Sequence, residues 1–91
     1  MGRLEDRIFR LNDEIAALQQ AEQLAANELD VHRHLNDDAR RDALVSDNPF
    51  DRSDARDTAA DVARFERHIA KLQQSRSKLE AKRDKLLAKL G

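Results

Sequence analysis

Apolar residues recur at alternating spacings of four and three in two long stretches, and this pattern constrains the fold more than any other feature. The first stripe runs through Leu4, Ile8, Leu11, Ile15 and Leu18 and continues through Glu22, Ala25 and Leu29. In the second stretch, companion lines run through Val62, Ile69, Arg76, Arg83 and Leu90 and through Phe65, Leu72, Leu79 and Leu86. Such spacing places apolar side chains on one face of a helix and is typical of coiled coils.

Helix breakers are scarce and lie between the two stretches. The 91 residues include two Gly and one Pro, and the Pro falls in the polar segment 46–54. Pro49 disfavours helix at the residue before it, and Ser53 or Asp54 is a suitable N-cap for a following helix. The sequence therefore predicts two helices and one loop, over about 3–45, 54–90 and 46–53. The whole chain (1–91) is then a single all-α domain, an antiparallel two-helix coiled-coil hairpin.

The distribution of charge favours the antiparallel arrangement. Residues 1–30 hold seven acids and three Arg, a net charge of −4, whereas residues 66–91 hold eight bases and three acids, a net charge of +5. A hairpin lays the acidic first arm beside the basic last arm. A loop centred near Phe50 places Glu22 opposite Arg76, and each of these is the polar exception on its own apolar stripe. We therefore expect the two side chains to form an ion pair that reports the register.

A second apolar line, formed by Leu24, Val31 and Leu35, lies beside the stripe of the first helix. Two apolar stripes on one helix require two neighbours, and a lone hairpin supplies only one. Small single-core chains are also only marginally stable. We therefore expect a homodimer that forms an antiparallel four-helix bundle, with Leu24, Val31 and Leu35 at the contact between chains. A monomeric hairpin is the alternative.

The composition argues against an enzyme and against a cofactor or metal site. The chain has no Cys, and nothing in it resembles a Gly-rich phosphate loop or a Ser/His/Asp triad. His32 falls near His68 in the expected register, and with Asp30 or Asp61 these imidazoles either bind a metal ion or only pack. We interpret them as packing residues. No apolar stretch approaches the ~20 residues of a membrane span, so we expect a cytoplasmic protein without a membrane partner.

The basic last arm suggests one alternative function, nucleic-acid binding by a helical bundle. The candidate residues are Lys78, Lys82, Arg83, Lys85 and Lys89. The acidic first arm lies against part of this patch in the expected hairpin, and the patch contains no aromatic residue for base stacking. We therefore expect nucleic acid not to be the main partner.

The predicted loop contains an aromatic residue, Phe50, flanked by Asp47, Asp51 and Asp54. Phe50 either covers the end of the core or is exposed as an anchor for a protein partner. These four residues form the candidate interaction tip. Together with the dimer contact, they favour a non-enzymatic structural or protein-interaction module that self-associates and binds a protein partner.

The loop also resembles part of a known family. The segment Asn48-Pro49-Phe50-Asp51-Arg52-Ser53, set between two long helices, is similar to the coiled-coil tip of the DksA/TraR-type regulators of bacterial RNA polymerase. In that family a tip of Asp-Pro-x-Asp-Arg-Ala reaches down the secondary channel of the polymerase toward the catalytic magnesium. The resemblance matches Asp51 to the second tip aspartate, with Asn48 in place of the first and Ser53 in place of the alanine. The family's zinc-binding cysteines have no counterpart here. The resemblance implies, as an alternative function, a regulator that inserts an acidic hairpin tip into the polymerase channel.

Overall fold

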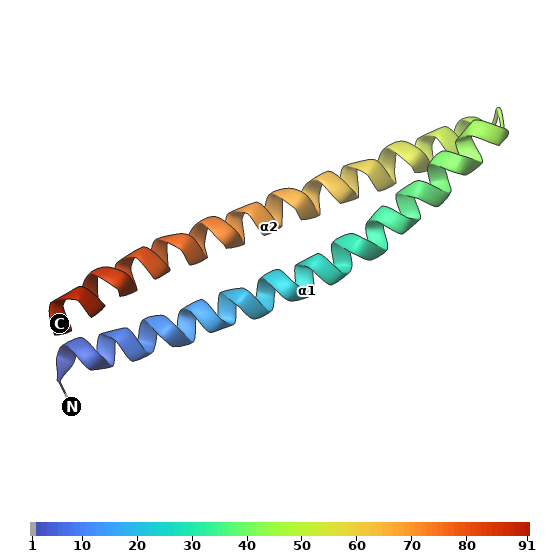
Figure 1. The fold of residues 1–91 in the computed structure, drawn as a ribbon. Coiled ribbons are helices and arrows are strands. Elements are labelled where there is room, and N and C mark those ends of the chain that lie inside the picture. Colours follow the sequence, from blue (N-terminus) through green and yellow to red (C-terminus); the bar gives the residue numbers. More distant parts are fainter. Residues whose placement is uncertain (1) are drawn as a thin grey trace. The chain divides into compact units, whose positions relative to one another are not determined.

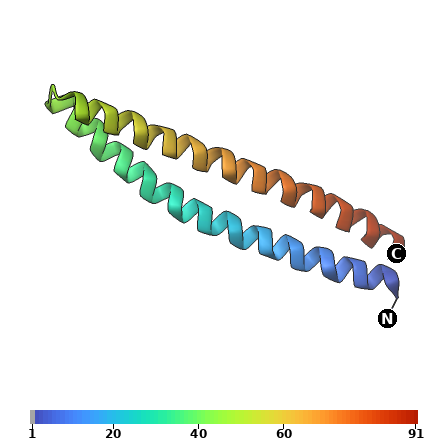
Figure 2. The ribbon, with the colours of Figure 1, turned by 180° about the vertical axis from the view of Figure 1, so that it is seen from behind.

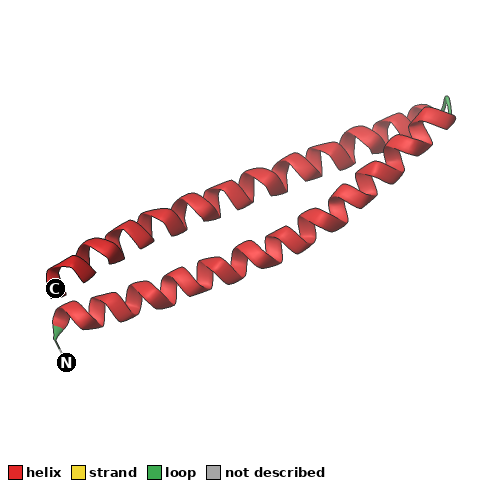
Figure 3. Ribbon diagram, viewed as in Figure 1, coloured by secondary structure: helices red, strands yellow, loops and turns green. Residues whose placement is uncertain are grey.

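The computed structural model describes residues 2–91 and contains two long helices joined by a short loop. Helix α1 spans Arg3–Val45 and helix α2 spans Pro49–Leu90, and the two run antiparallel (Figures 1 and 2). Residues 2–91 contain no strand (Figure 3). The chain is therefore the all-α helical hairpin that the two apolar stripes predict.

The hairpin divides into two compact units. Unit 1 consists of the chain up to Gln23 together with Ala70–Gly91, and unit 2 consists of Leu24–Ile69. Each helix contributes one segment to each unit. Unit 1 contains both ends of the chain, and unit 2 contains the loop (Figure 1).

The buried side chains of both units lie on the predicted stripes. In unit 1, Ile8, Leu11 and Leu86 form one cluster, against which Leu4 and Leu79 pack. The remaining buried apolar residues are Ile15, Ala25 and Leu29. Removing a leucine-sized side chain from water contributes about 1.5–3 kcal/mol, so these few residues supply much of the stabilisation of a helix pair.

Helix α2 begins at Pro49, earlier than the predicted start at about residue 54, and the loop shortens to residues 46–48. The N-cap is Asn48 and not Ser53 or Asp54, because Asn48 Oδ1 accepts a hydrogen bond from the Phe50 N–H at 2.9 Å. The Asn48 carbonyl also accepts hydrogen bonds from the Asp51 and Arg52 N–H groups, at 3.1 and 3.4 Å. Proline suits the first helical position, where no intrahelical partner exists for an N–H group. The sequence pattern alone indicates this proline only as a helix breaker.

Candidate interaction site

The structure brings Glu22 and Arg76 together in unit 1. Arg76 Nε donates to Glu22 Oε2 at 2.5 Å, and Arg76 Nη2 donates to Glu22 Oε1 at 3.1 Å. The third guanidinium nitrogen, Nη1, donates to Glu80 Oε1 at 2.7 Å. The side chains of Glu22 and Arg76 are only 14% and 27% exposed. This two-pronged geometry is the strongest form of arginine–carboxylate pairing.

The two carboxylates also act on the ionisation of the guanidinium. The hydrogen bonds to Glu22 and, to a smaller extent, to Glu80 raise the pKa of Arg76 above its usual value, because they stabilise the charged form. Arginine is charged at every pH at which proteins fold, so this contact supplies a permanent positive charge on the α2 stripe. The Glu22–Arg76 contact thus fixes the register between α1 and α2 in unit 1.

A second polar contact, which the sequence analysis missed, links the helices of unit 2. The Asn36 amide donates from Nδ2 to the Ala55 carbonyl at 3.0 Å and to Thr58 Oγ1 at 2.9 Å. Asn36 lies on the continuation of the α1 stripe, four residues after His32. A polar residue at a stripe position was the sequence feature that could have indicated this contact. Thr58 lies nearer the loop than the residue expected opposite Asn36, because the loop is centred on Asp47 and not on Phe50.

The predicted dimer contact is exposed. Leu24, Val31 and Leu35 of α1 are 65%, 58% and 49% exposed. Each directly precedes a buried or half-buried residue of the core face, which continues past Leu29 through His32 and Asn36. Since each residue advances about 100° around a helix, this line faces roughly sideways from the core. In unit 2 it is an apolar line on a lateral face of α1.

The tip of unit 2 presents further apolar side chains to solvent. Phe50 is 78% exposed, so it does not cover the end of the core. Leu44 and Val45, at the end of α1, are 86% and 88% exposed. The predicted tip acids lie close to them in the sequence, with Asp47 and Asp54 exposed and Asp51 half-buried in the first turn of α2. An exposed aromatic ring bordered by acids can anchor a basic, apolar partner surface.

The histidines do not meet as a metal-binding group. His32 stacks on Phe65 with ring centroids 4.6 Å apart, and its buried Nδ1 has no hydrogen-bond partner within residues 2–91. His68 is exposed, and His34 Nδ1 lies 2.7 Å from the Asp30 carbonyl oxygen within α1. Across the described chain, no three His, Asp or Glu side chains are placed to hold a metal ion.

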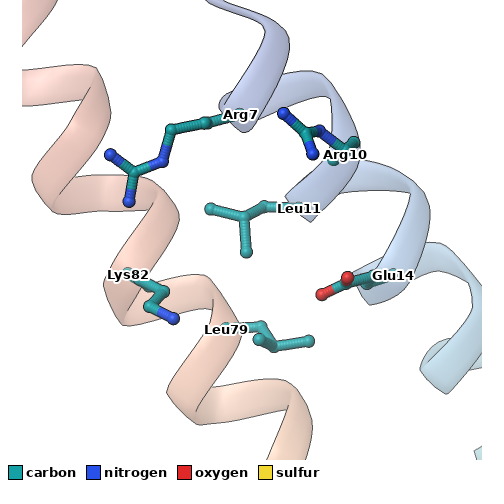
Figure 4. A pocket seen from close by; sticks show the side chains of 6 residues that line it. All are labelled: Arg7, Arg10, Leu11, Glu14, Leu79 and Lys82. Carbon is teal, nitrogen blue, oxygen red and sulfur yellow. The ribbon is translucent and has the colours of Figure 1, made fainter. Parts of the chain in front are cut away.

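Unit 1 carries a basic hollow with a volume of about 370 Å³. Its rim holds Arg7 and Arg10 from α1 and Lys82 from α2, with Glu14 as the one acid, and Leu11 and Leu79 lie between them (Figure 4). None of these three cations forms an ion pair within residues 2–91, whereas the neighbouring Arg83 Nε donates to Asp84 Oδ1 at 3.3 Å. The other members of the predicted basic patch, Lys78, Lys85 and Lys89, are exposed. The hollow therefore has positive charges available for an acidic partner.

Comparison with known proteins adds no family to this description. No protein-family model, curated protein or solved structure matches the chain. Neither helix, within the described residues, combines the length and apolar character that crossing a membrane requires. The exposed surfaces themselves are therefore the basis on which function is proposed.

Proposed function

We propose that this chain is a non-enzymatic structural and protein-interaction module, a helical hairpin that self-associates. The observation that carries the proposal is the exposed apolar line Leu24, Val31 and Leu35 on α1. Solvated helix faces are normally polar, and an exposed apolar line at helical spacing, interrupted here only by Glu28, marks a surface that another element covers. A second copy of the hairpin supplies such an element and completes a four-helix bundle.

Position on the helix supports this interpretation. The line lies roughly 100° around α1 from the stripe that faces α2, close to the right angle between the two neighbours of each helix in a four-helix bundle. Scattered exposed leucines, by contrast, need no explanation. Here three side chains share one face of one unit, and each is about half exposed or more.

Sedimentation equilibrium tests the proposal. The wild-type chain is expected to dimerise, and a variant with Leu24→Gln, Val31→Gln and Leu35→Gln is expected to dimerise more than 100-fold more weakly. Six side chains leave the contact, and each contributes on the order of 1 kcal/mol or less when half-buried there. Glutamine is nearly as good a helix former as leucine, so the hairpin itself is preserved.

Leu44→Gln is the matched control for this experiment. Leu44 is more exposed than any residue of the line, at 86%, but lies outside it. Dimerisation of the Leu44→Gln variant is expected to equal that of the wild type. A wild-type chain that stays monomeric at several hundred micromolar would refute self-association, and equal effects of both substitutions would remove the line as the contact.

A second candidate function uses the tip, and the exposure of Phe50 supports it. The Asn48 cap holds Pro49 and Phe50 at the first turn of α2, so the ring is displayed on ordered backbone. This is the segment that resembles the tip of the polymerase regulators. In this second proposal the tip enters the secondary channel of RNA polymerase, with Asp51 nearest the catalytic magnesium.

Copurification with core RNA polymerase tests the tip. Under this proposal the wild-type chain is retained by immobilised polymerase, and both Phe50→Ala and Asp51→Ala reduce retention at least tenfold by removing the anchor and the tip charge. The control is Asp84→Ala, which changes an exposed acid in unit 1, far along α2 from the tip. Absence of retention for the wild type would retire the polymerase proposal and leave self-association untouched.

A further inference from the structure

We propose that the basic hollow of unit 1 is the docking site for the acidic part of unit 2 of a second copy, so that two hairpins associate antiparallel. This inference rests on the proposed self-association and specifies its geometry. The central contact joins Lys82 of one copy with Asp57 of the other. Three observations support it: the order of charges along α2, the order of charges along α1, and the unpaired cations of the hollow.

The α2 core stripe continues from Val62 toward the loop through Thr58 and Ala55, which are half-buried and bonded to Asn36. The first observation concerns the residues that directly precede this extended stripe, which we call the lateral line of α2. From the tip toward the C-terminus, its members are Asp54, Asp57, Asp61, Arg64, His68, Lys71, Ser75, Lys78, Lys82, Lys85 and Lys89. The three acids all lie in unit 2, and the four lysines from Lys78 onward all lie in unit 1. No acid interrupts the basic part of this line.

The lateral line of α1, defined in the same way, changes charge in the same sense. From the N-terminus toward the loop, its members are Arg3, Arg7, Arg10, Glu14, Ala17, Ala21, Leu24, Glu28, Val31, Leu35, Asp38 and Asp42. The apolar contact proposed above is thus the middle of a line that is mainly basic in unit 1 and acidic in unit 2. The hollow takes Arg7 and Arg10 from this line and Lys82 from that of α2, so in unit 1 both lines border the same surface.

The charges that would meet are free to do so. Arg7, Arg10 and Lys82 are exposed and form no ion pair within residues 2–91, and the same holds for Asp54 and Asp57. Two acids of the lateral lines, in contrast, are already paired within the chain: Asp61 with Arg64 and Asp38 with Arg41. Leu11 lies among the cations and Leu79 lies between Lys82 and Glu14, so the hollow offers the docked helix apolar side chains as well as charge (Figure 4). Apolar surroundings lower the local dielectric constant and so strengthen the attraction between opposite charges.

Orientation follows from the signs. In a parallel pair, the acidic ends of the lateral lines of the two copies would lie against each other, and so would their basic ends, and like charges placed opposite one another are unfavourable. Reversing one copy places acid against base at both ends and leaves the Leu24–Leu35 segment against itself. A two-fold axis generates both charge contacts at once, so each favourable pair occurs twice. Antiparallel association is therefore the arrangement that the charges select.

Charge exchange tests the contact by sedimentation equilibrium at low salt. Lys82→Glu and Asp57→Lys are each expected to weaken dimerisation about tenfold, because each turns two attractive contacts into two repulsive ones. The double variant Lys82→Glu with Asp57→Lys is expected to recover most of the wild-type affinity. Both losses of affinity, and the recovery in the double variant, are expected to shrink at 1 M salt, where the Debye length is about 3 Å.

The outcomes separate this inference from the proposal on which it rests. A dimer that is lost on replacing Leu24, Val31 and Leu35, but that is unaffected by Lys82→Glu and Asp57→Lys, overturns the antiparallel docking and leaves self-association standing. Two weakened single variants without recovery in the double variant overturn the Asp57–Lys82 contact. A monomeric wild type overturns both proposals. Because both positions are exposed, each variant is expected to keep its helices, and far-UV circular dichroism checks this.

Thiol cross-linking gives an independent measure of orientation, because the chain has no cysteine of its own. A variant with Asp57→Cys and Lys82→Cys is expected to form covalent dimers with a short bismaleimide. The two positions are about 38 Å apart along one helix, so the reagent cannot join them within a chain. The single variants Asp57→Cys and Lys82→Cys are the controls and are expected to remain uncross-linked. Efficient cross-linking of either single variant would demonstrate a parallel dimer.

The same hollow could instead attract a nucleic-acid backbone, and the experiment distinguishes this class of partner. Phosphate contacts by Arg and Lys give affinities that fall steeply with salt. Binding of a mixed-sequence DNA or RNA oligonucleotide that Lys82→Glu abolishes, with dimerisation unchanged in that variant, would overturn the docking proposal in favour of nucleic acid. No oligonucleotide binding at about 50 mM salt is the result expected here.

Discussion

Leu86→Ala is expected to lower the free energy of unfolding by about 2–4 kcal/mol, the usual range for a buried leucine replaced by alanine. Leu86 is 5% exposed and forms the unit 1 cluster with Ile8 and Leu11. A two-helix core has few other side chains that can move to fill the cavity. Urea unfolding followed by circular dichroism, at several protein concentrations, measures the loss separately from any effect on dimerisation.

Leu87→Ala is the matched control for Leu86→Ala. It removes the same atoms from the adjacent residue of α2, but Leu87 is 44% exposed and loses less on truncation. We expect a loss below about 1 kcal/mol for this variant. Similar losses at the two positions would mean that the stripe through Leu86 is not the face that packs on α1.

Glu22→Arg is expected to lower the melting temperature by about 10 °C or more. The substitution removes both hydrogen bonds from Arg76 to Glu22 and places two guanidinium groups against each other in a half-buried contact. Adding Arg76→Glu is expected to restore part of the loss by recreating the pair with exchanged charges. Recovery stays incomplete because the carboxylate introduced at position 76 would lie one helical turn from Glu80, which Arg76 binds in the wild type.

Glu66→Arg provides the reference for this charge-reversal pair. Glu66 is exposed on α2 and forms no ion pair within residues 2–91, so reversing its charge is expected to shift the melting temperature by only a few degrees. Additive effects of Glu22→Arg and Arg76→Glu, without recovery in the double variant, would show that the two side chains do not interact in solution.

The stripes predict the fold well because a hairpin is encoded locally. Spacings of four and three define each helix and its buried face, and the six buried residues found among residues 2–91 all lie on these stripes. The polar exceptions at positions 22 and 76 are the only such pair that the expected register brings together, and their side chains are long enough to meet despite a small error in the loop centre. Long side chains thus tolerate an approximate register.

Short-range features were predicted less well. The start of α2 at Pro49 depends on the hydrogen bonds that Asn48 accepts within a single backbone turn. Asn, Ser and Asp are all suitable N-caps, so the sequence does not show which of Asn48, Ser53 and Asp54 begins the helix. The contact of Asn36 with Thr58 needs an exact register, because both side chains are short. Phe50 is exposed because α2 begins at Pro49, which places Phe50 in the first turn of the helix and not in a loop that could fold over the core.

The loop has a further consequence for how two copies can combine. If residues 46–48 became helical, α1 and α2 would fuse into one continuous rod, which could bury its stripes only by exchanging arms with a second rod. The residue before a proline disfavours helix, and the bond from the Phe50 N–H to Asn48 Oδ1 would be lost in such a rod. Asn48 and Pro49 therefore oppose domain swapping. Each chain then keeps its own core, and in the dimer proposed above two closed hairpins meet through their lateral faces.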